Sequence, residues 1–224
     1  MAISATERSG EIDEGTMSDI LDRKTVVLAA GDFPAPGGFA RRLLENAERV
    51  VCCDSAADAY WEEFRREPNA VVGDCDSIRR DYANLVRVSE QDTNDLSKAI
   101  FYCREQGWND IVVLGASGKR EDHALGNVFR ALAEQVVLVT EYGIFYPVNG
   151  AAEFEVSPGA GVSIFAPERE TVMTSKGLQW PLDGVRFENL YLATLNRASS
   201  GLFSVTSNRP VFVYVEGDSL WKTK

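Results

Sequence analysis

The sequence has few of the features that mark secreted, membrane-bound or nucleic-acid-binding proteins. Its 23 lysines and arginines are outnumbered by 34 aspartates and glutamates, whereas nucleic acid and anionic membranes require clustered basic residues. No apolar run is as long as a membrane span, and the first residues lack the basic start and apolar core of a signal peptide. The four cysteines form no CxxC pair, which favours reduced thiols over disulfides or a zinc site. We therefore expect a cytoplasmic protein with neither nucleic acid nor a membrane as its partner.

Several common catalytic patterns are also missing. The sequence has one histidine, His123, so a histidine-dependent triad would have to use it, and no GxSxG elbow supplies a nucleophile. A lone histidine is often structural, and both interpretations of His123 remain open. With a net charge of −11, the protein would need a metal ion or a local basic group to bind an anionic substrate.

Short apolar runs alternate with helix-like segments between residues 25 and 148. We expect strands at 26–30, 49–53, 70–72, 84–88, 111–114 and 136–140, and helices at 38–46, 56–66, 95–106 and 122–134. Near-continuous apolar strands are typical of a sheet that is covered on both faces. Their alternation with helices predicts an α/β fold with a doubly wound, mostly parallel, Rossmann-like sheet.

The pattern changes after about Tyr146, where helical periodicity ends and short alternating runs begin. We expect strands at 153–156, 161–165, 170–174, 190–195, 201–206 and 210–215, separated by Gly, Pro, Asn and Asp, which is typical of an all-β sandwich or small barrel. The expected parts are an acidic N-terminal tail (1–23), an α/β domain (24–147) and a β-sandwich domain (148–224).

Carboxylates follow several of the expected strands of the α/β half. Asp74 and Asp76 come directly after the strand at 70–72, and open α/β sheets bind ligands at the carboxyl ends of their strands. Mg²⁺ prefers one or two carboxylates together with waters and substrate phosphates, so this loop suits a metal that carries a polyphosphate. The alternative is an ordinary turn with Asp76 or Ser77 as a helix N-cap.

Two other loops add carboxylates to the same sheet edge. Asp54 follows the second strand, as either an N-cap or a ligand contact. Asp92 and Asp95 precede the helix at 95–106, where Asp is also favoured by capping and by the helix dipole. Together the loops could form a cage for one or two metal ions.

A glycine turn, Gly115 to Gly118, follows the strand at 111–114 and leads to Arg120 and Asp122. It is not a Walker loop, because only two residues separate Gly115 from Gly118 and Arg120 stands where Ser or Thr would hold magnesium. A glycine turn, a helix N-terminus and an arginine nevertheless form a credible site for phosphate oxygens.

In the β half, the segment Ser175 to Leu182 places Trp180 between polar turn residues. A tryptophan in an all-β domain is usually part of the core, so packing is the alternative to ligand contact. Asn196 could contact a ligand or simply form a turn.

In this order, the segments resemble the thiamine pyrophosphokinase family over nearly the whole chain from Val26 to Gly217. The matching motifs are Gly73-Asp74-Cys75-Asp76-Ser77, Asp92-Thr93-Asn94-Asp95, Gly115 to His123, and Gly177-Leu178-Gln179-Trp180-Pro181-Leu182. The chain departs from the family pattern at Ser55, Asn94, Lys119 and Leu195.

The resemblance implies transfer of the pyrophosphoryl group of ATP to the hydroxyl of thiamine, giving thiamine diphosphate and AMP. It also implies a homodimer whose active sites are shared between the chains. The implied site residues are Asp74, Asp76 and Asp95 for Mg²⁺ and catalysis, with Arg120 and Asp122 also catalytic; Asp54, Ser77, Asp92, Gly115, Gly118, Arg120 and His123 for the nucleotide; and Asp95, Ser175, Trp180 and Asn196 for thiamine.

Two other functions remain open at this point. Asp-x-Asp loops serve many Mg²⁺-dependent phosphotransferases and nucleotidyltransferases. A catalytically silent thiamine- or nucleotide-binding protein would also explain the altered Ser55, Lys119 and Leu195 positions.

Overall fold

The first part of the chain alternates strands and helices as its apolar periodicity predicts. The computed structural model describes residues 13, 14, 20, 23–90 and 92–217. Each expected element of this half is present, and its bounds agree with the expectation to within two residues. The strands are β2 (Thr25–Leu28), β3 (Arg49–Cys53), β4 (Ala70–Gly73), β5 (Leu85–Arg87), β6 (Ile111–Leu114) and β7 (Val137–Val139), and the helices are α2 (Phe39–Asn46), α3 (Ala56–Phe64), α4 (Asp95–Glu105) and α5 (Glu121–Ala133).

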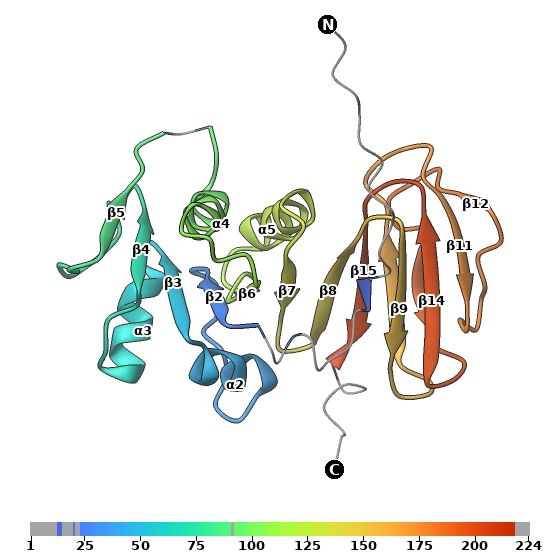
Figure 1. Cartoon of the computed structure of the whole chain (residues 1–224), viewed down its shortest axis with the longest axis horizontal. Helices are drawn as coiled ribbons and strands as arrows, with labels where there is room; N and C mark the ends of the chain where they lie inside the picture. The colour runs from blue at the N-terminus through green and yellow to red at the C-terminus, as the bar shows by residue number, and fades with distance from the viewer. Residues whose placement is uncertain (1–12, 15–19, 21–22, 91, 218–224) are drawn as a thin grey trace, which may run out of the picture.

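The six strands form a parallel array in the order β5-β4-β3-β2-β6-β7. Its two faces carry separate hydrophobic clusters, because neighbouring side chains of a strand point to opposite faces: Val26 belongs to one cluster and Val27 to the other. Helices α2 and α3 cover one face and α4 and α5 cover the other (Figure 1). The doubly wound α/β fold is therefore confirmed.

The strand order reverses between β2 and β6. The chain leaves β2 for α2 on one face and leaves β6 for α5 on the other. A crevice outside the carboxyl ends of the strands at such a switch point is where open α/β sheets bind their ligands.

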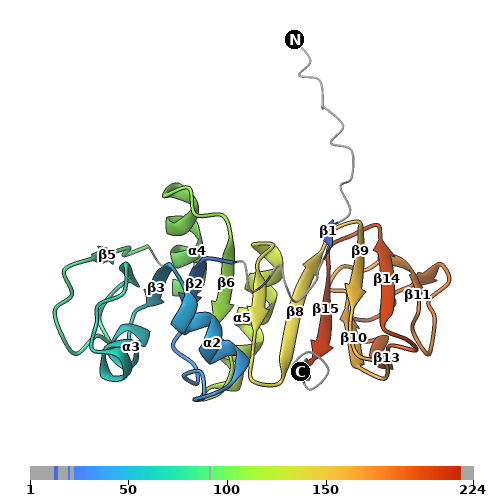
Figure 2. The same ribbon diagram turned by 60° about the horizontal axis from the view of Figure 1, so that its bottom comes forward.

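The rest of the chain is antiparallel β structure. Its strands are β8 (Gly143–Val148), β9 (Ala151–Glu155), β10 (Gly161–Phe165), β11 (Val172–Lys176), β12 (Val185–Arg186), β13 (Ala193–Arg197), β14 (Leu202–Ser207) and β15 (Val211–Glu216). Strands β8, β15, β10 and β13 continue the large sheet beyond β7, giving ten strands in all. The second sheet has the order β1-β9-β14-β11-β12, where β1 (Asp13–Glu14) runs parallel to β9 (Figure 2).

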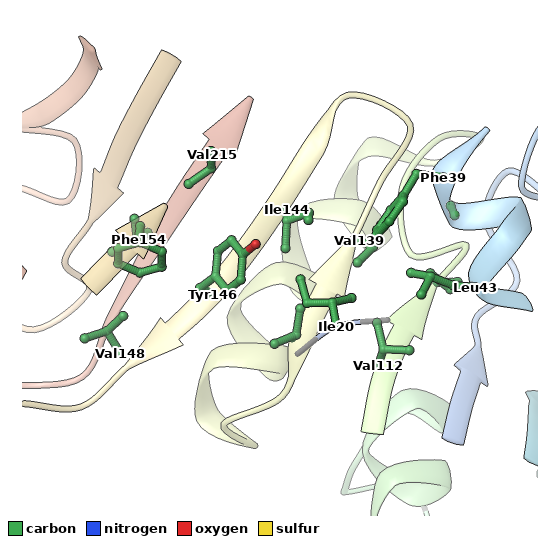
Figure 3. Packing of buried hydrophobic residues seen from close by; sticks show 14 of the residues in the cluster. Ile20, Phe39, Leu43, Val112, Val139, Ile144, Tyr146, Val148, Phe154 and Val215 are labelled. Carbon is green, nitrogen blue, oxygen red and sulfur yellow. The ribbon is translucent and has the colours of Figure 1, made fainter. Parts of the chain in front are cut away.

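Aromatic side chains join the two sheets. Tyr146 of β8 meets Phe154 of β9 with their ring centroids 5.2 Å apart, and Phe154 stacks on Phe203 of β14 at 4.8 Å. Figure 3 shows Tyr146 and Phe154 in the same cluster as Val215 of β15 and Ile20, which is buried. The inner faces of the two sheets thus form the expected sandwich core.

Several details of the β half differ from the expectation. Strands β8 and β12 were not expected, and the strands expected at 170–174 and 190–195 instead begin at Val172 and Ala193. Glu170 has left-handed backbone (φ 71°), and the Thr194 hydroxyl donates to the carbonyl of Tyr191, so turns occupy both places where we expected strands to begin. None of the described helices is long and apolar enough to cross a membrane.

Strand β8 spans the expected boundary between residues 147 and 148, so one sheet is continuous through it. The division into two domains therefore stays a prediction. Of the expected tail, residues 13, 14, 20 and 23 are described, and the remainder lies outside the described residues.

Candidate active site

A cleft of about 370 Å³ opens at the carboxyl ends of β2, β3 and β4, beside the switch point. The start of α4 and the first turns of α5 complete it. Its lining includes Asp54, Ser55, Asp74, Asp76, Ser77, Thr93, Asn94, Asp95, Lys98, His123 and Asn127. The structure therefore brings the three acidic loops of the sequence to one place.

Three carboxylates converge in this cleft. Asp54, Asp74 and Asp95 each offer an oxygen atom within 4.8 Å of the other two. Asp54 is only 7% exposed, and its Oδ1 has no hydrogen-bond partner among the described residues. Burial raises the pKa of Asp54, and the negative charges of Asp95, Asp74 and Asp76 raise it further. An unpaired, buried carboxylate oxygen within an acidic cluster fits a hard divalent cation, which would satisfy it.

The local backbone makes this convergence possible. A Cβ atom on Gly73 would lie 3.2 Å from the Cβ of Asp54 and 3.3 Å from the Asp95 carboxylate, so the glycine leaves space for both. Cys75 has left-handed backbone (φ 62°) in the turn that presents Asp74. The alternative in which Asp76 or Ser77 caps a helix is excluded, because no helix begins in the described residues 74–90. Asp54 is not a cap either, since the N-cap of α3 is Ser55 and it makes no side-chain capping bond.

Two of the expected site residues, Asp76 and Asp92, lie outside the group of three carboxylates. Asp76 lines the cleft but stands outside the group of three, and it accepts a hydrogen bond of 2.8 Å from the Ser77 hydroxyl. Asp92 is exposed and does not line the cleft; its backbone N–H donates to the Glu90 carboxylate at 2.9 Å.

Lys98 and Asn127 also line the cleft, and neither was expected from the sequence. The Lys98 ammonium donates to Oδ1 of Asp95 at 3.3 Å, and its side chain is only 4% exposed. Asn127 donates to the carbonyl of Ala116 at 3.2 Å and accepts from Asn94 at 3.3 Å, while Asn94 caps α4 by accepting from the Ser97 N–H at 3.0 Å. A lysine one turn into a helix, three residues after an acidic motif residue, was the signal that could have found Lys98.

The glycine turn lies against the loop that follows β2. The N–H of Gly31 donates to the carbonyl of Gly115 at 2.7 Å, and that of Asp32 donates to the carbonyl of Ser117 at 2.8 Å. Gly118 has a φ of 77°, and a Cβ atom there would lie 1.8 Å from a carboxylate oxygen of Asp32. Gly115 and Gly118 line a second, mostly apolar cavity of about 590 Å³ between this turn, α5 and the β7–β8 pair.

Arg120 does not line the acidic cleft in this structure. Its guanidinium donates to both carboxylate oxygens of Asp122, at 3.1 and 2.6 Å, and both side chains are exposed. This hydrogen bond lowers the pKa of Asp122 to about 2. His123, by contrast, does line the cleft.

Trp180 is 54% exposed, so it is not part of the sandwich core. The side chain of Asn196 makes two hydrogen bonds with the backbone of Trp180. Its amide donates to the Trp180 carbonyl at 2.7 Å, and its Oδ1 accepts from the Trp180 N–H at 3.2 Å. The Ser175 hydroxyl accepts from the N–H of Leu182 at 2.9 Å at the other end of the loop. Asn196 and Ser175 therefore stabilise the loop that presents Trp180.

Two protein-family models match this chain and identify its family. The family model described as the catalytic domain of thiamin pyrophosphokinase matches residues 40–138, and the one described as its substrate-binding domain matches residues 143–214. The chain belongs to the thiamin pyrophosphokinase family. The matched catalytic domain contains all three clustered carboxylates, and the matched substrate-binding domain contains Trp180.

Individual members of the thiamin pyrophosphokinase family agree with this assignment. Thiamine pyrophosphokinase 1 of Arabidopsis thaliana is 29% identical over 225 residues, which cover 82% of this chain and 80% of that protein. Thiamine pyrophosphokinase 1 of Oryza sativa subsp. japonica is 30% identical over 185 residues, covering 65% of this chain and 69% of that protein. The solved thiamin pyrophosphokinase from Candida albicans has the same fold, with a TM-score of 0.75, 18% identity and 95% of each chain covered. The resemblance inferred from the motifs is confirmed.

Proposed function

We propose that this chain is an enzyme that transfers the pyrophosphoryl group of ATP to the hydroxyl of thiamine, giving thiamine diphosphate and AMP. The observation that carries the proposal is the convergence of Asp54, Asp74 and Asp95 at the switch point of a chain that belongs to the thiamin pyrophosphokinase family. Attack of the thiamine oxygen on the β-phosphorus breaks the bond to the oxygen that leaves with AMP. Such transfer needs alignment and charge neutralisation and little covalent help from the protein.

The clustered carboxylates would hold Mg²⁺, which supplies positive charge to the phosphate oxygens. Asp76 and Ser77 line the same cleft and are placed to contact the metal-bound phosphates or waters. Arg120 would have to leave Asp122 to reach the moving pyrophosphoryl group, and its exposure permits that movement. The glycine turn, which lines the larger apolar cavity, suits the remainder of the nucleotide.

The decisive experiment is product analysis after incubation with ATP, Mg²⁺ and thiamine. We expect AMP and thiamine diphosphate in equal amounts, and no turnover when the divalent cation is chelated. ADP as the primary product would indicate an ordinary kinase, free pyrophosphate would indicate a nucleotidyltransferase, and binding without AMP would indicate a silent binding protein. Asp74→Asn should abolish turnover, whereas Asp81→Asn, at an exposed position outside the cleft, is the matched control.

We also propose that the enzyme is a homodimer with active sites shared between its chains. Trp180 is exposed beside β11 and β12, which lie at the opposite end of the molecule from β3 and β4 (Figure 1). A thiamine ring stacked on Trp180 therefore needs the acidic cleft of a second chain. Further apolar side chains of the same half are also exposed: Tyr191, Leu192, Leu195 and Leu202.

Mixed dimers test the shared site directly. Asp74→Asn and Trp180→Ala chains, each inactive or impaired alone, should regain activity when mixed, because one of the two sites then has both functional groups. Absence of any recovery, with subunit exchange confirmed, would refute sharing.

The cysteines support a cytoplasmic location as part of this proposal. All four are free and buried, and burial raises the pKa of the Cys103 thiol to about 12. Buried thiols of this kind suit a reducing compartment.

A further inference from the structure

Lys98 is a buried lysine at the edge of the acidic cleft. Its side chain is 4% exposed, and its ammonium lies 3.3 Å from Oδ1 of Asp95. Within the part of the chain that the structure describes, it is the only lysine or arginine that lines the cleft. Arg120, the arginine that we expected in the site from the sequence, is instead paired with Asp122 at the surface.

The position of Lys98 is unfavourable for a lysine on its own. Burying an ammonium group is strongly disfavoured unless it is paired. Lys98 is also the fourth residue of α4, counted from Asp95, and the positive end of the helix dipole repels a cation there. Both the burial of the ammonium group and the helix dipole therefore disfavour a lysine here, and the groups around it must compensate.

The three clustered carboxylates compensate the positive charge of Lys98. Asp54, Asp74 and Asp95 gather within 4.8 Å without a hydrogen bond between them, and such a group repels itself. We infer that Lys98 is a positioning residue: it is the internal counter-ion that holds Asp95 in the cluster while no metal is bound. The inference rests on the proposed function only in taking this cluster as the cation site.

This role has a consequence for metal binding. A cation that binds the cluster must share Asp95 with the Lys98 ammonium, so lysine and metal compete for the same carboxylate. Removing the ammonium should therefore destabilise the metal-free protein and strengthen its affinity for a divalent cation. A lysine that only filled space would affect the two forms equally.

Thermal unfolding of Lys98→Met tests the first half of this consequence, because methionine keeps most of the length of the side chain and removes its charge. In the presence of a chelator we expect the melting temperature to fall by roughly 5–10 °C, and saturating MnCl₂ should restore more than half of the loss. The control is Lys24→Met, which removes an exposed lysine 3.6 Å from Glu48 and should change the melting temperature by only about 1 °C with or without metal.

Mn²⁺ binding, followed by electron paramagnetic resonance, tests the second half without any need for turnover. Lys98→Met should bind Mn²⁺ more tightly than the wild type, on the order of tenfold. Unchanged or weaker binding, or a loss of melting temperature that is equal with and without metal, would overturn the inference. Because neither measurement uses thiamine, a failure here is distinct from a failure of the proposed reaction.

A double variant keeps the test decisive if Lys98→Met does not fold. Adding Asp95→Asn removes the charge that Lys98 is inferred to balance, so the double variant should fold and melt close to Asp95→Asn alone. A double variant as unstable as Lys98→Met would show that the lysine acts through packing.

Discussion

Asp54→Asn is the substitution that most directly tests the acidic cluster. It preserves the size of a side chain that is 7% exposed and removes one of three charges that lie within 4.8 Å of one another. The structure makes two opposite predictions for it. The metal-free protein should become more stable, and the metal-dependent reaction should be lost.

The magnitudes follow from the geometry. At separations of 4.8 Å or less, each pair of charged carboxylates repels by at least about 3.5 kcal/mol with an effective dielectric constant of about 20. Asp54 takes part in two such pairs, and Lys98 and solvent offset part of the repulsion. We therefore expect a net increase of about 1–2 kcal/mol in the unfolding free energy of the metal-free variant. Loss of one charged ligand should lower turnover by roughly 10²–10³-fold, the size of effect typical of a single electrostatic contact in an active site.

The assays are urea unfolding in the presence of a chelator and AMP formation at a series of Mg²⁺ concentrations. The matched control is Asp76→Asn, which lies in the same cleft outside the group of three and should retain more activity and raise the metal-free stability less. If Asp54→Asn is less stable than the wild type without metal, or if only Asp76→Asn abolishes turnover, the cluster is assigned to the wrong residues.

Three further predictions concern the loops around the site. Trp180→Ala should raise the KM for thiamine while urea unfolding shows less than about 2 kcal/mol of lost stability, because the side chain is already half exposed. Gly118→Ala should lower the unfolding free energy by about 1–2 kcal/mol, because alanine is strained in the left-handed backbone (φ 77°) and its Cβ would displace the exposed carboxylate of Asp32. Arg120→Ala should raise the pKa of Asp122 from about 2 towards 3.8, measured by NMR titration; an unchanged pKa would mean that the two groups are not paired in solution.

The α/β half was predictable because its signals are strong and local. Its strands are short apolar runs such as Ile111–Leu114, and their ends are marked by glycine or by polar residues. In the β half, edges depend on turn geometry that periodicity does not report. Strand β8 was missed because it contains Pro147 and lies where the large sheet changes from parallel to antiparallel pairing.

The site was predictable in its location and only partly in its members. Strand order brings the loops after β3 and β4 together with the start of α4, so Asp74 and Asp95 were found from position alone. The direction of the Asp54 side chain depends on its backbone, which has a φ of 40°. No pattern in the sequence predicts that φ value. The pairing of Lys98 with Asp95 was missed because a lysine on a helix usually faces solvent, although the spacing of three residues was a signal for it.

The four departures from the family pattern leave the clustered carboxylates intact: Ser55 and Asn94 are helix N-caps, and Lys119 and Leu195 lie at the surface. Lys119 and Leu195 both have left-handed backbone, with φ values of 56° and 61°, which costs a residue with a side chain about 1 kcal/mol. The Lys119 ammonium donates to the Ala30 carbonyl at 3.0 Å, which offsets the strain there. Leu195 lies within β13, where the register with β10 is irregular, and its N–H donates to the Ser163 hydroxyl at 3.0 Å. Because these substitutions change backbone energy at the surface and remove none of the three carboxylates, they give no reason to expect a protein that binds its ligands without turning them over.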